Sequence, residues 1–233
     1  MNCLNPVISG VTTDGGYAEV MIAEARALAL IPEELNSVDA APLVCAGITT
    51  YNALRNAGLR SGDLVAVLGI GGLGHLGIQF ANKMGFRTVA LARGAEKEPL
   101  AKRLGAHAYI NTEAEDGAAA LMRMGGADAI LATVTNGPAI AALIGGLAVR
   151  GKMVVVGVPL EPIPVSAFPL VFGGRSIHGS LTGSAIDNQD TLDFSVLHNI
   201  RPMIETMPLE KAPEAYARMM DNKARFRMVL TMN

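Results

Sequence analysis

The sequence predicts an α/β fold built around a doubly wound parallel sheet of the Rossmann type. From residue 45 onward, short apolar segments rich in valine, isoleucine and leucine alternate with segments of helical apolar spacing. The apolar segments are almost free of charge, as strands buried on both faces of a parallel sheet should be. A glycine-rich turn follows the first of them. We therefore expect the sheet to occupy residues 45–195.

The individual elements follow from the same alternation. The predicted strands are the segments 64–70, 87–92, 108–112, 127–134, 152–158 and 176–181. The predicted helices between them span 74–84, 98–104, 112–124 and 138–149. Strands separated by helices are joined by right-handed crossovers into a parallel sheet. The first strand should lie inside this sheet and not at its edge.

The two ends of the chain have a different pattern. Residues 1–44 contain "DGGYAEVMIAE" (14–24), which predicts a turn leading into an alternating strand, and then a helix that begins near Ser37. Residues 196–233 contain a helical pattern at 209–221 and a closing strand, "FRMVLTM". We expect both ends to present apolar faces that no partner strand covers.

Composition excludes several classes of function. Half of the 233 residues are hydrophobic, 17% are charged and the net charge is −2, so the chain is globular. Its basic residues are dispersed, which argues against a nucleic-acid or membrane-surface partner. Two cysteines make no disulfide scaffold, and neither a signal peptide nor a membrane-spanning stretch is visible. A cytoplasmic location is the expectation.

The glycine-rich turn has the pattern G-x-G-x-x-G between a predicted strand and a predicted helix. It consists of Gly69, Ile70, Gly71, Gly72, Leu73 and Gly74. In this context Gly69 permits a tight turn, Gly71 lets a pyrophosphate approach the backbone, and Gly74 lets the helix pack against the strand. The helix N-terminus supplies N–H groups and positive dipole to the phosphates. The turn therefore predicts a dinucleotide site, against the alternative of a turn that merely packs.

The end of the second strand bears on which dinucleotide is bound. Enzymes that use NAD usually place an acidic residue there, about 20 residues after the glycine turn, to bind the ribose 2′-hydroxyl. Here the segment reads Ala92-Arg93-Gly94, without a carboxylate. Arg93, together with Lys97, could pair with a 2′-phosphate. This favours NADP over NAD, with a solvated loop arginine as the alternative.

Two other motifs are excluded by their context. The segment "GLAVRGK" (146–152) has P-loop spacing, but Met153 stands where a Ser or Thr must hold magnesium. Its glycines precede a strand, so we interpret it as a helix end that turns into a strand. Short-chain dehydrogenases need a Tyr-x-x-x-Lys motif, but none of the four tyrosines has a lysine four residues later.

A set of longer segments points to one family. These are "TTDGGYAEV" (12–20), "AAPLVCAGITTYNAL" (40–54), "GIGGLGHLG" (69–77), "LAKRLGAHAYIN" (100–111), "VVVGVP" (154–159) and "KARFRMVL" (223–230). Through them the chain resembles, over its whole length, the zinc-dependent alcohol dehydrogenases of the medium-chain dehydrogenase/reductase family. The resemblance implies hydride transfer between a nicotinamide cofactor and a small alcohol or aldehyde.

The resemblance also assigns roles to cofactor-binding residues. Thr49 matches a residue beside the nicotinamide, and Val158 matches one close to the same ring. Gly71, Gly72 and Leu73 match the residues at the pyrophosphate. Arg227 matches a basic residue that reaches the cofactor phosphates, with a snorkelling strand arginine as the alternative.

The resemblance assigns metal ligands less completely. Cys45 matches the last ligand of the catalytic zinc, and Cys3 matches the last of four cysteines around a structural zinc; a buried cysteine that acts only as a small hydrophobe is the alternative. The family's other ligands precede the segment that Met1 begins. The four histidines are not at ligand positions, and His75 is expected to face solvent or to pack locally. We therefore expect zinc to be substoichiometric or absent, because a catalytic zinc needs three protein ligands.

The expected protein is the cofactor-binding part of such an enzyme. Residues 1–44 and 196–233 would be remnants of a GroES-like β domain, and no catalytic set is complete, so the chain should be inactive alone. The alternatives are a zinc-independent quinone or enoyl reductase of the same family and a non-catalytic dinucleotide-binding module. The resemblance further implies a homo-oligomer through the sheet edge at 176–181, since unpaired edge strands associate.

Overall fold

The computed structural model describes residues 5–232, and its contacts divide the chain into two compact units. We call residues 49–181 the central unit, and residues 1–48 with 182–233 the terminal unit. The sequence-based limits at 44/45 and 195/196 are not the same as these, and the second falls inside the helix that ends at Leu197. The GroES-like nature of the ends stays a prediction.

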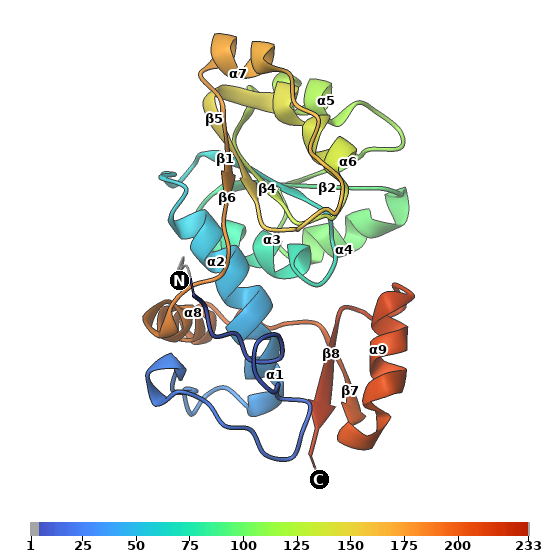
Figure 1. The fold of residues 1–233 in the computed structure, drawn as a ribbon. Coiled ribbons are helices and arrows are strands. Elements are labelled where there is room, and N and C mark those ends of the chain that lie inside the picture. Colours follow the sequence, from blue (N-terminus) through green and yellow to red (C-terminus); the bar gives the residue numbers. More distant parts are fainter. Residues whose placement is uncertain (1–4, 233) are drawn as a thin grey trace. The chain divides into compact units, whose positions relative to one another are not determined.

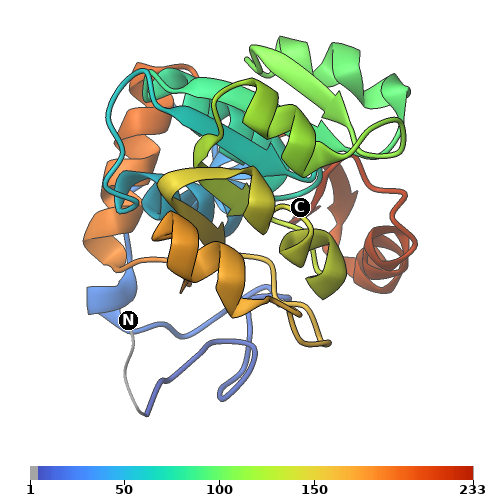
Figure 2. The same cartoon turned by 90° about the horizontal axis from the view of Figure 1, so that it is seen from above.

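The central unit contains the predicted Rossmann sheet (Figure 1, Figure 2). Its strands are β1 (Leu64–Leu68), β2 (Arg87–Ala92), β3 (Ala108–Asn111), β4 (Ala127–Ala132), β5 (Leu147–Val155) and β6 (Ser176–Gly179). They are ordered β3-β2-β1-β4-β5-β6, and every neighbouring pair is parallel. All five residues of β1 are buried, and β1 lies between β2 and β4. The fold class and the interior position of the first strand are therefore confirmed.

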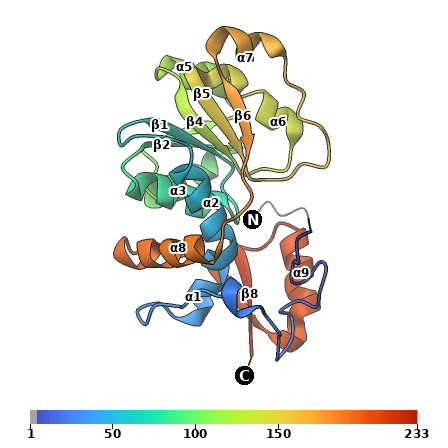
Figure 3. The ribbon, with the colours of Figure 1, turned by 60° about the vertical axis from the view of Figure 1, so that its left-hand side comes forward.

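Helices cover both faces of the sheet (Figure 3). They are α2 (Ile48–Arg55), α3 (Gly74–Lys83), α4 (Glu98–Arg103), α5 (Gly117–Arg123), α6 (Gly137–Ala141) and α7 (Ala167–Gly173), with short 3-10 turns at Ala95–Lys97 and Ile144–Gly146. The crossover rule puts the helices before and after β2 on one face and those from α5 to α7 on the other. The rings of Tyr51 and Phe80, 5.4 Å apart, hold α2 on the face of α3.

Two predicted helix boundaries were wrong. The helix expected at 112–124 begins at Gly117, because the side chain of Asp116 accepts a hydrogen bond from Ala119 N and caps it there. The helix expected at 138–149 ends early, since residues from Leu147 onward pair with β4 and belong to β5. The segment with P-loop spacing accordingly leaves a short 3-10 turn at Gly146 and enters a strand, as its glycines indicated.

The terminal unit combines segments from both ends of the chain. It contains α1 (Ser37–Pro42), a π-helical turn at Leu43–Gly47, α8 (Ala185–Leu197), β7 (Ile204–Pro208), α9 (Ala212–Met220) and β8 (Arg227–Thr231), with 3-10 turns at Ala25–Ala27 and Leu209–Lys211. The strands β7 and β8 are parallel and joined through α9. The helix near Ser37, the helix at 209–221 and the closing strand are thus confirmed, whereas α2, α7, α8 and β7 were not predicted.

The alternating strand predicted after a turn within residues 14–24 was wrong. Among the described residues this segment has no paired strand, and the nearest pairing is an isolated bridge between Ser9 and Thr13. A strand needs a partner for its backbone groups, and an alternating sequence does not supply one. The expected apolar exposure is present, because Val20 and Ile22 are 81% and 94% exposed.

Candidate functional site

The glycine turn connects β1 to α3 at the carboxyl end of the central strands. A Cβ on Gly69, where φ is +97°, would lie 2.7 Å from Val134 Cγ1 and 2.9 Å from Thr133 Oγ1. A Cβ on Gly74 would overlap the carbonyl oxygen of Gly69. These two positions therefore require glycine so that the chain can turn and α3 can start directly behind the strand.

Gly71 has the opposite surroundings. A Cβ there would meet no atom within 4 Å, and the residue is half-buried together with Gly72 and Leu73. Packing therefore does not explain why this position is glycine. The open space in front of it is the place where a ligand could come close to the backbone, beside the N-terminus of the ten-residue helix α3. The turn fits a dinucleotide pyrophosphate on this observation.

His75 holds the turn from inside the protein. Its side chain is buried, its Nδ1 lies 2.8 Å from the carbonyl oxygen of Gly71, and its backbone N donates to the same oxygen over 3.1 Å. A proton on Nδ1 makes the first of these contacts a hydrogen bond. The expectation of local packing is confirmed and that of solvent exposure was wrong. Sequence reasoning missed the contribution of His75 to the turn.

The ends of β4 and β5 lie beside the turn. Thr133 Oγ1 donates to the carbonyl oxygen of Leu68 over 2.7 Å, and a Cβ on Gly157 would overlap the carbonyl oxygen of Val134. Val158 follows Gly157 and is 77% exposed. Val158 was predicted as a site residue, whereas Thr133 and Val134 were not. Their signal was the strand order, because ligands bind where the order of a doubly wound sheet reverses, here between β1 and β4.

Thr49 lies at the start of α2 and is buried, with 6% of its surface exposed. The same helix approaches α3 closely, because a Cβ on Gly77 would lie 2.9 Å from Leu131 Cδ2 and 3.6 Å from Thr50 Cγ2. Gly77 therefore lets α3 pack between the sheet and α2. This packing fixes the helix that carries Thr49.

The loop after β2 has a rigid backbone and exposed charges. Gly94 N donates to Asn111 Oδ1 over 3.0 Å, and the hydroxyl of Tyr109 donates to the carbonyl oxygens of Ala92, over 3.2 Å, and Gly94. Arg93 is exposed beside these bonds. The hydrogen bonds hold the loop in place while the arginine side chain faces outward.

Two acidic residues, Glu96 and Glu98, follow Arg93 in the chain. A Cβ on Gly94 would overlap the carboxylate of Glu96, whereas Lys97 is half-buried. The pKa of Tyr109 is raised by partial burial first and then by the negative charges of Glu96, Glu98 and Glu113. Sequence reasoning missed this acidic surrounding, although Glu96 and Glu98 were visible in the segment after β2 and Glu113 in the segment after β3.

The remaining predicted residues belong to the terminal unit. Cys45 is exposed on the π-helical turn Leu43–Gly47, a backbone irregularity that occurs often at functional sites. Arg227 is half-buried at the start of β8 and lines a cavity of about 100 Å³ together with Tyr17 and Tyr216. Cys3 lies outside the described residues.

The described residues do not fit a zinc ion. No three His, Cys, Asp or Glu side chains between residues 5 and 232 are grouped so that they could hold a metal. The histidines have local contacts instead. His107 Nδ1 accepts from Thr88 N over 3.0 Å, and His178 Nε2 lies 2.8 Å from Ser176 Oγ. The His198 ring packs at a tilt against that of Phe194, with the ring centroids 4.3 Å apart. In the part of the chain described, none of the helices has the length and apolarity to cross a bilayer.

The fold and the turn define the class of protein. A parallel sheet in this strand order, with a G-x-G-x-x-G turn at the end of its first strand, is a dinucleotide-binding Rossmann domain. A family model described as zinc-binding dehydrogenase matches residues 72–196. The chain belongs to this family, the medium-chain alcohol dehydrogenases, as its motifs indicated.

Known proteins support the same assignment. The chain is 44% identical over 230 residues to the alcohol dehydrogenase patD of Penicillium expansum, covering 99% of this chain and 67% of that protein. It is similar to the cinnamyl alcohol dehydrogenase of Sorghum bicolor, with a TM-score of 0.84, 33% identity, and coverage of 95% and 63%. It is also similar to CAD from Helicobacter pylori, solved in complex with NADP(H), with a TM-score of 0.70, 31% identity, and coverage of 82% and 54%. The chain thus spans about two thirds of the length of patD and less of these two structures.

Proposed function

We propose that this chain binds a nicotinamide dinucleotide and forms the cofactor-binding portion of an alcohol dehydrogenase. The whole enzyme would move a hydride between a small alcohol or aldehyde and the nicotinamide. The observation that carries the proposal is the open space at Gly71, a glycine that packing does not require. The names of the relatives support the alcohol dehydrogenase reaction over a quinone or enoyl reductase.

Different residues of the chain would bind different parts of the cofactor. The backbone at Gly71, Gly72 and Leu73, together with the N–H groups at the start of α3, would hold the pyrophosphate. Thr49 and Val158 would lie beside the nicotinamide, and Arg227 would contact a cofactor phosphate, as the family resemblance suggests. When bound, the cofactor supplies the hydride acceptor of the reaction.

Catalysis would need more than the described residues offer. Cys45 is the proposed ligand of a catalytic zinc in the whole enzyme. Among residues 5–232, however, it does not belong to a group of three side chains that could hold a metal. This favours, for the described part of the chain, dinucleotide binding without alcohol oxidation. We further propose that the edge strand β6, where Ile177 and His178 are exposed, is a contact between copies in a homo-oligomer.

A matched pair of glycine variants tests the site. Gly71→Ala places a methyl group in open space, so it should leave thermal unfolding unchanged but weaken binding of NADPH by more than about tenfold, because the methyl keeps the pyrophosphate from the backbone. Gly145→Ala is the control, since a Cβ there meets only Ala118 Cβ at 3.8 Å. A fluorescence titration measures both. Equal affinity of the two variants would contradict the proposed site.

We propose NADP as the preferred cofactor, since Ala92 leaves no carboxylate at the end of β2 and Arg93 is exposed beside it. The complex of the Helicobacter pylori relative with NADP(H) supports this choice. Charge reversal by Arg93→Glu should erase the preference for NADPH over NADH, because it removes the partner of the 2′-phosphate and adds like-charge repulsion. Parallel titrations with the two cofactors measure the ratio of affinities. A wild-type ratio near one would contradict the proposed preference for NADP.

A further inference from the structure

The start of β8 is held by its neighbours and not by a broad sheet. β8 pairs only with β7 in the described residues, in a register that begins with Ile204 opposite Arg227. An isolated two-stranded sheet is marginally stable by itself. The helix α9 packs on both strands, but the loop that leads from it into β8 decides where Arg227 lies. The contacts of this loop therefore determine the position of that arginine.

Three consecutive backbone N–H groups fix the loop to the start of β7. Arg225 N donates to Glu205 Oε1 over 2.8 Å. Phe226 N and Arg227 N both donate to the carbonyl oxygen of Met203, over 3.0 and 3.1 Å. Of the two acceptors, only Glu205 Oε1 belongs to a side chain, so it is the part of this attachment that a substitution can remove.

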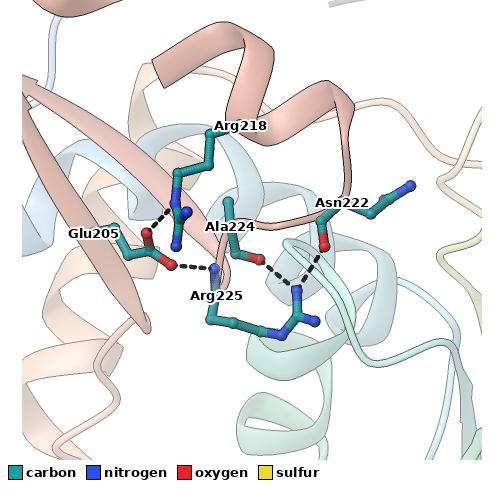
Figure 4. Close-up of polar contacts among 5 residues, drawn as sticks. All are labelled: Glu205, Arg218, Asn222, Ala224 and Arg225. Carbon is teal, nitrogen blue, oxygen red and sulfur yellow. Dashed lines mark hydrogen bonds and ion pairs between the residues drawn. The ribbon is translucent and has the colours of Figure 1, made fainter. Parts of the chain in front are cut away.

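The same carboxylate also binds α9 (Figure 4). Arg218 Nε donates to Glu205 Oε2 over 2.6 Å, while the other carboxylate oxygen takes the loop N–H. The guanidinium of Arg225 closes the loop on itself by donating to the carbonyl oxygens of Asn222 and Ala224, over 2.8 and 3.0 Å. Glu205 thus connects β7, α9 and the loop before β8 with one side chain.

The charge of Glu205 suits this arrangement. The hydrogen bond from Arg218 lowers the pKa of the Glu205 carboxyl most, and the backbone N–H of Arg225 lowers it further. The group therefore stays ionised and accepts at both oxygens. A glutamine could accept from one of the two donors but would present its own N–H to the other.

We propose that Glu205 is a positioning residue that holds Arg227 in place for its contact with a cofactor phosphate. The inference rests on the proposed role of Arg227 and adds the residue on which that role depends. Removing the carboxylate would leave Arg218 and Arg225 N, two residues before Arg227, without their common acceptor, so that only the bonds of Phe226 N and Arg227 N to Met203 would hold this part of the loop. Because contacts between guanidinium and phosphate depend on geometry, a small displacement of Arg227 weakens binding without removing any group that touches the cofactor.

A double-mutant cycle on the whole chain tests this, with NADPH affinity as the readout. Arg227→Ala should weaken binding about tenfold, the loss expected for one charge-assisted hydrogen bond. Glu205→Ala should weaken binding several-fold by itself but add nothing in the Arg227→Ala background. Glu210→Ala is the matched control, because Glu210 is exposed on the neighbouring 3-10 turn and should leave affinity unchanged.

The cycle separates positioning from a merely structural role. Losses that add in the double variant, or a Glu205→Ala variant with wild-type affinity, would overturn the inference. If Arg227→Ala itself has no effect, the proposed role of Arg227 fails, and Gly71→Ala still reports on the rest of the site. Glu205→Gln gives a second cycle if Glu205→Ala does not fold, and its smaller loss must likewise vanish in the Arg227→Ala background.

Discussion

The strands of the central unit and the segment before α1 in the terminal unit differ in how far their apolar side chains are buried. In the central unit the strands β1, β2 and β4 are buried almost throughout, and their side chains join one hydrophobic core. In the terminal unit the segment before α1 exposes large apolar side chains. These include Val7, Val11, Val20, Ile22 and Leu30, each more than 75% exposed. A strand that finds its partners within its own unit becomes structure, whereas an equally apolar segment without them stays irregular.

Two isoleucine substitutions test this contrast and carry the largest expected effect. Ile130 in β4 is fully buried, so Ile130→Ala should lower the free energy of unfolding by about 2–5 kcal/mol through lost burial and a cavity. Ile22 is 94% exposed, so Ile22→Ala should change it by less than about 0.5 kcal/mol. Denaturant unfolding of the two variants measures the difference. A comparable loss for both would show that Ile22 is covered in solution.

The same contrast explains which elements were predictable. The central strands are continuous apolar segments separated by glycine turns, so local sequence is enough to locate them. The strand at 14–24 was mispredicted because pairing is non-local. The helix α8 was missed although Ser184 and Asp187 form a capping box at its start.

Buried polar residues interrupt the apolar pattern of α8. Thr191 and Ser195 are buried polar residues, and their hydroxyls donate to the carbonyl oxygens of Asp187 and Thr191, each over 2.7 Å. These bonds satisfy the hydroxyls inside the helix, so polar residues occupy positions where a hydrophobic pattern would be sought. A reading based on apolar spacing therefore passes over the helix.

The residues of the candidate site likewise differ in whether local sequence was enough to predict them. Gly69, Gly71 and Gly74 were predictable because their roles depend on a local turn between a strand and a helix. Thr133 and Val134 were not, since they join the site only through the pairing of β1 with β4. The position of Glu96 against Gly94 likewise depends on how the loop folds back, which residue spacing does not specify.

The smallest expected effect is a loss of stability of the terminal unit at low pH. The folded-state pKa of Glu205 is lowered, by Arg218 first and by the Arg225 N–H next, so its contribution to stability is complete above the ordinary glutamate pKa. That contribution is lost as pH falls through the lowered folded-state pKa, because protonation removes an acceptor from the two donors.

The amide of Arg225 reports this protonation directly, because its N–H donates to the Glu205 carboxylate. In an NMR pH titration, the chemical shift of this amide should change with a midpoint below the usual glutamate pKa of about 4.3. Glu205→Gln should flatten the curve. An Arg225 midpoint at the ordinary glutamate value would mean that Arg218 does not hold the carboxylate in solution. The carboxylate would then bind the Arg225 N–H without connecting it to α9.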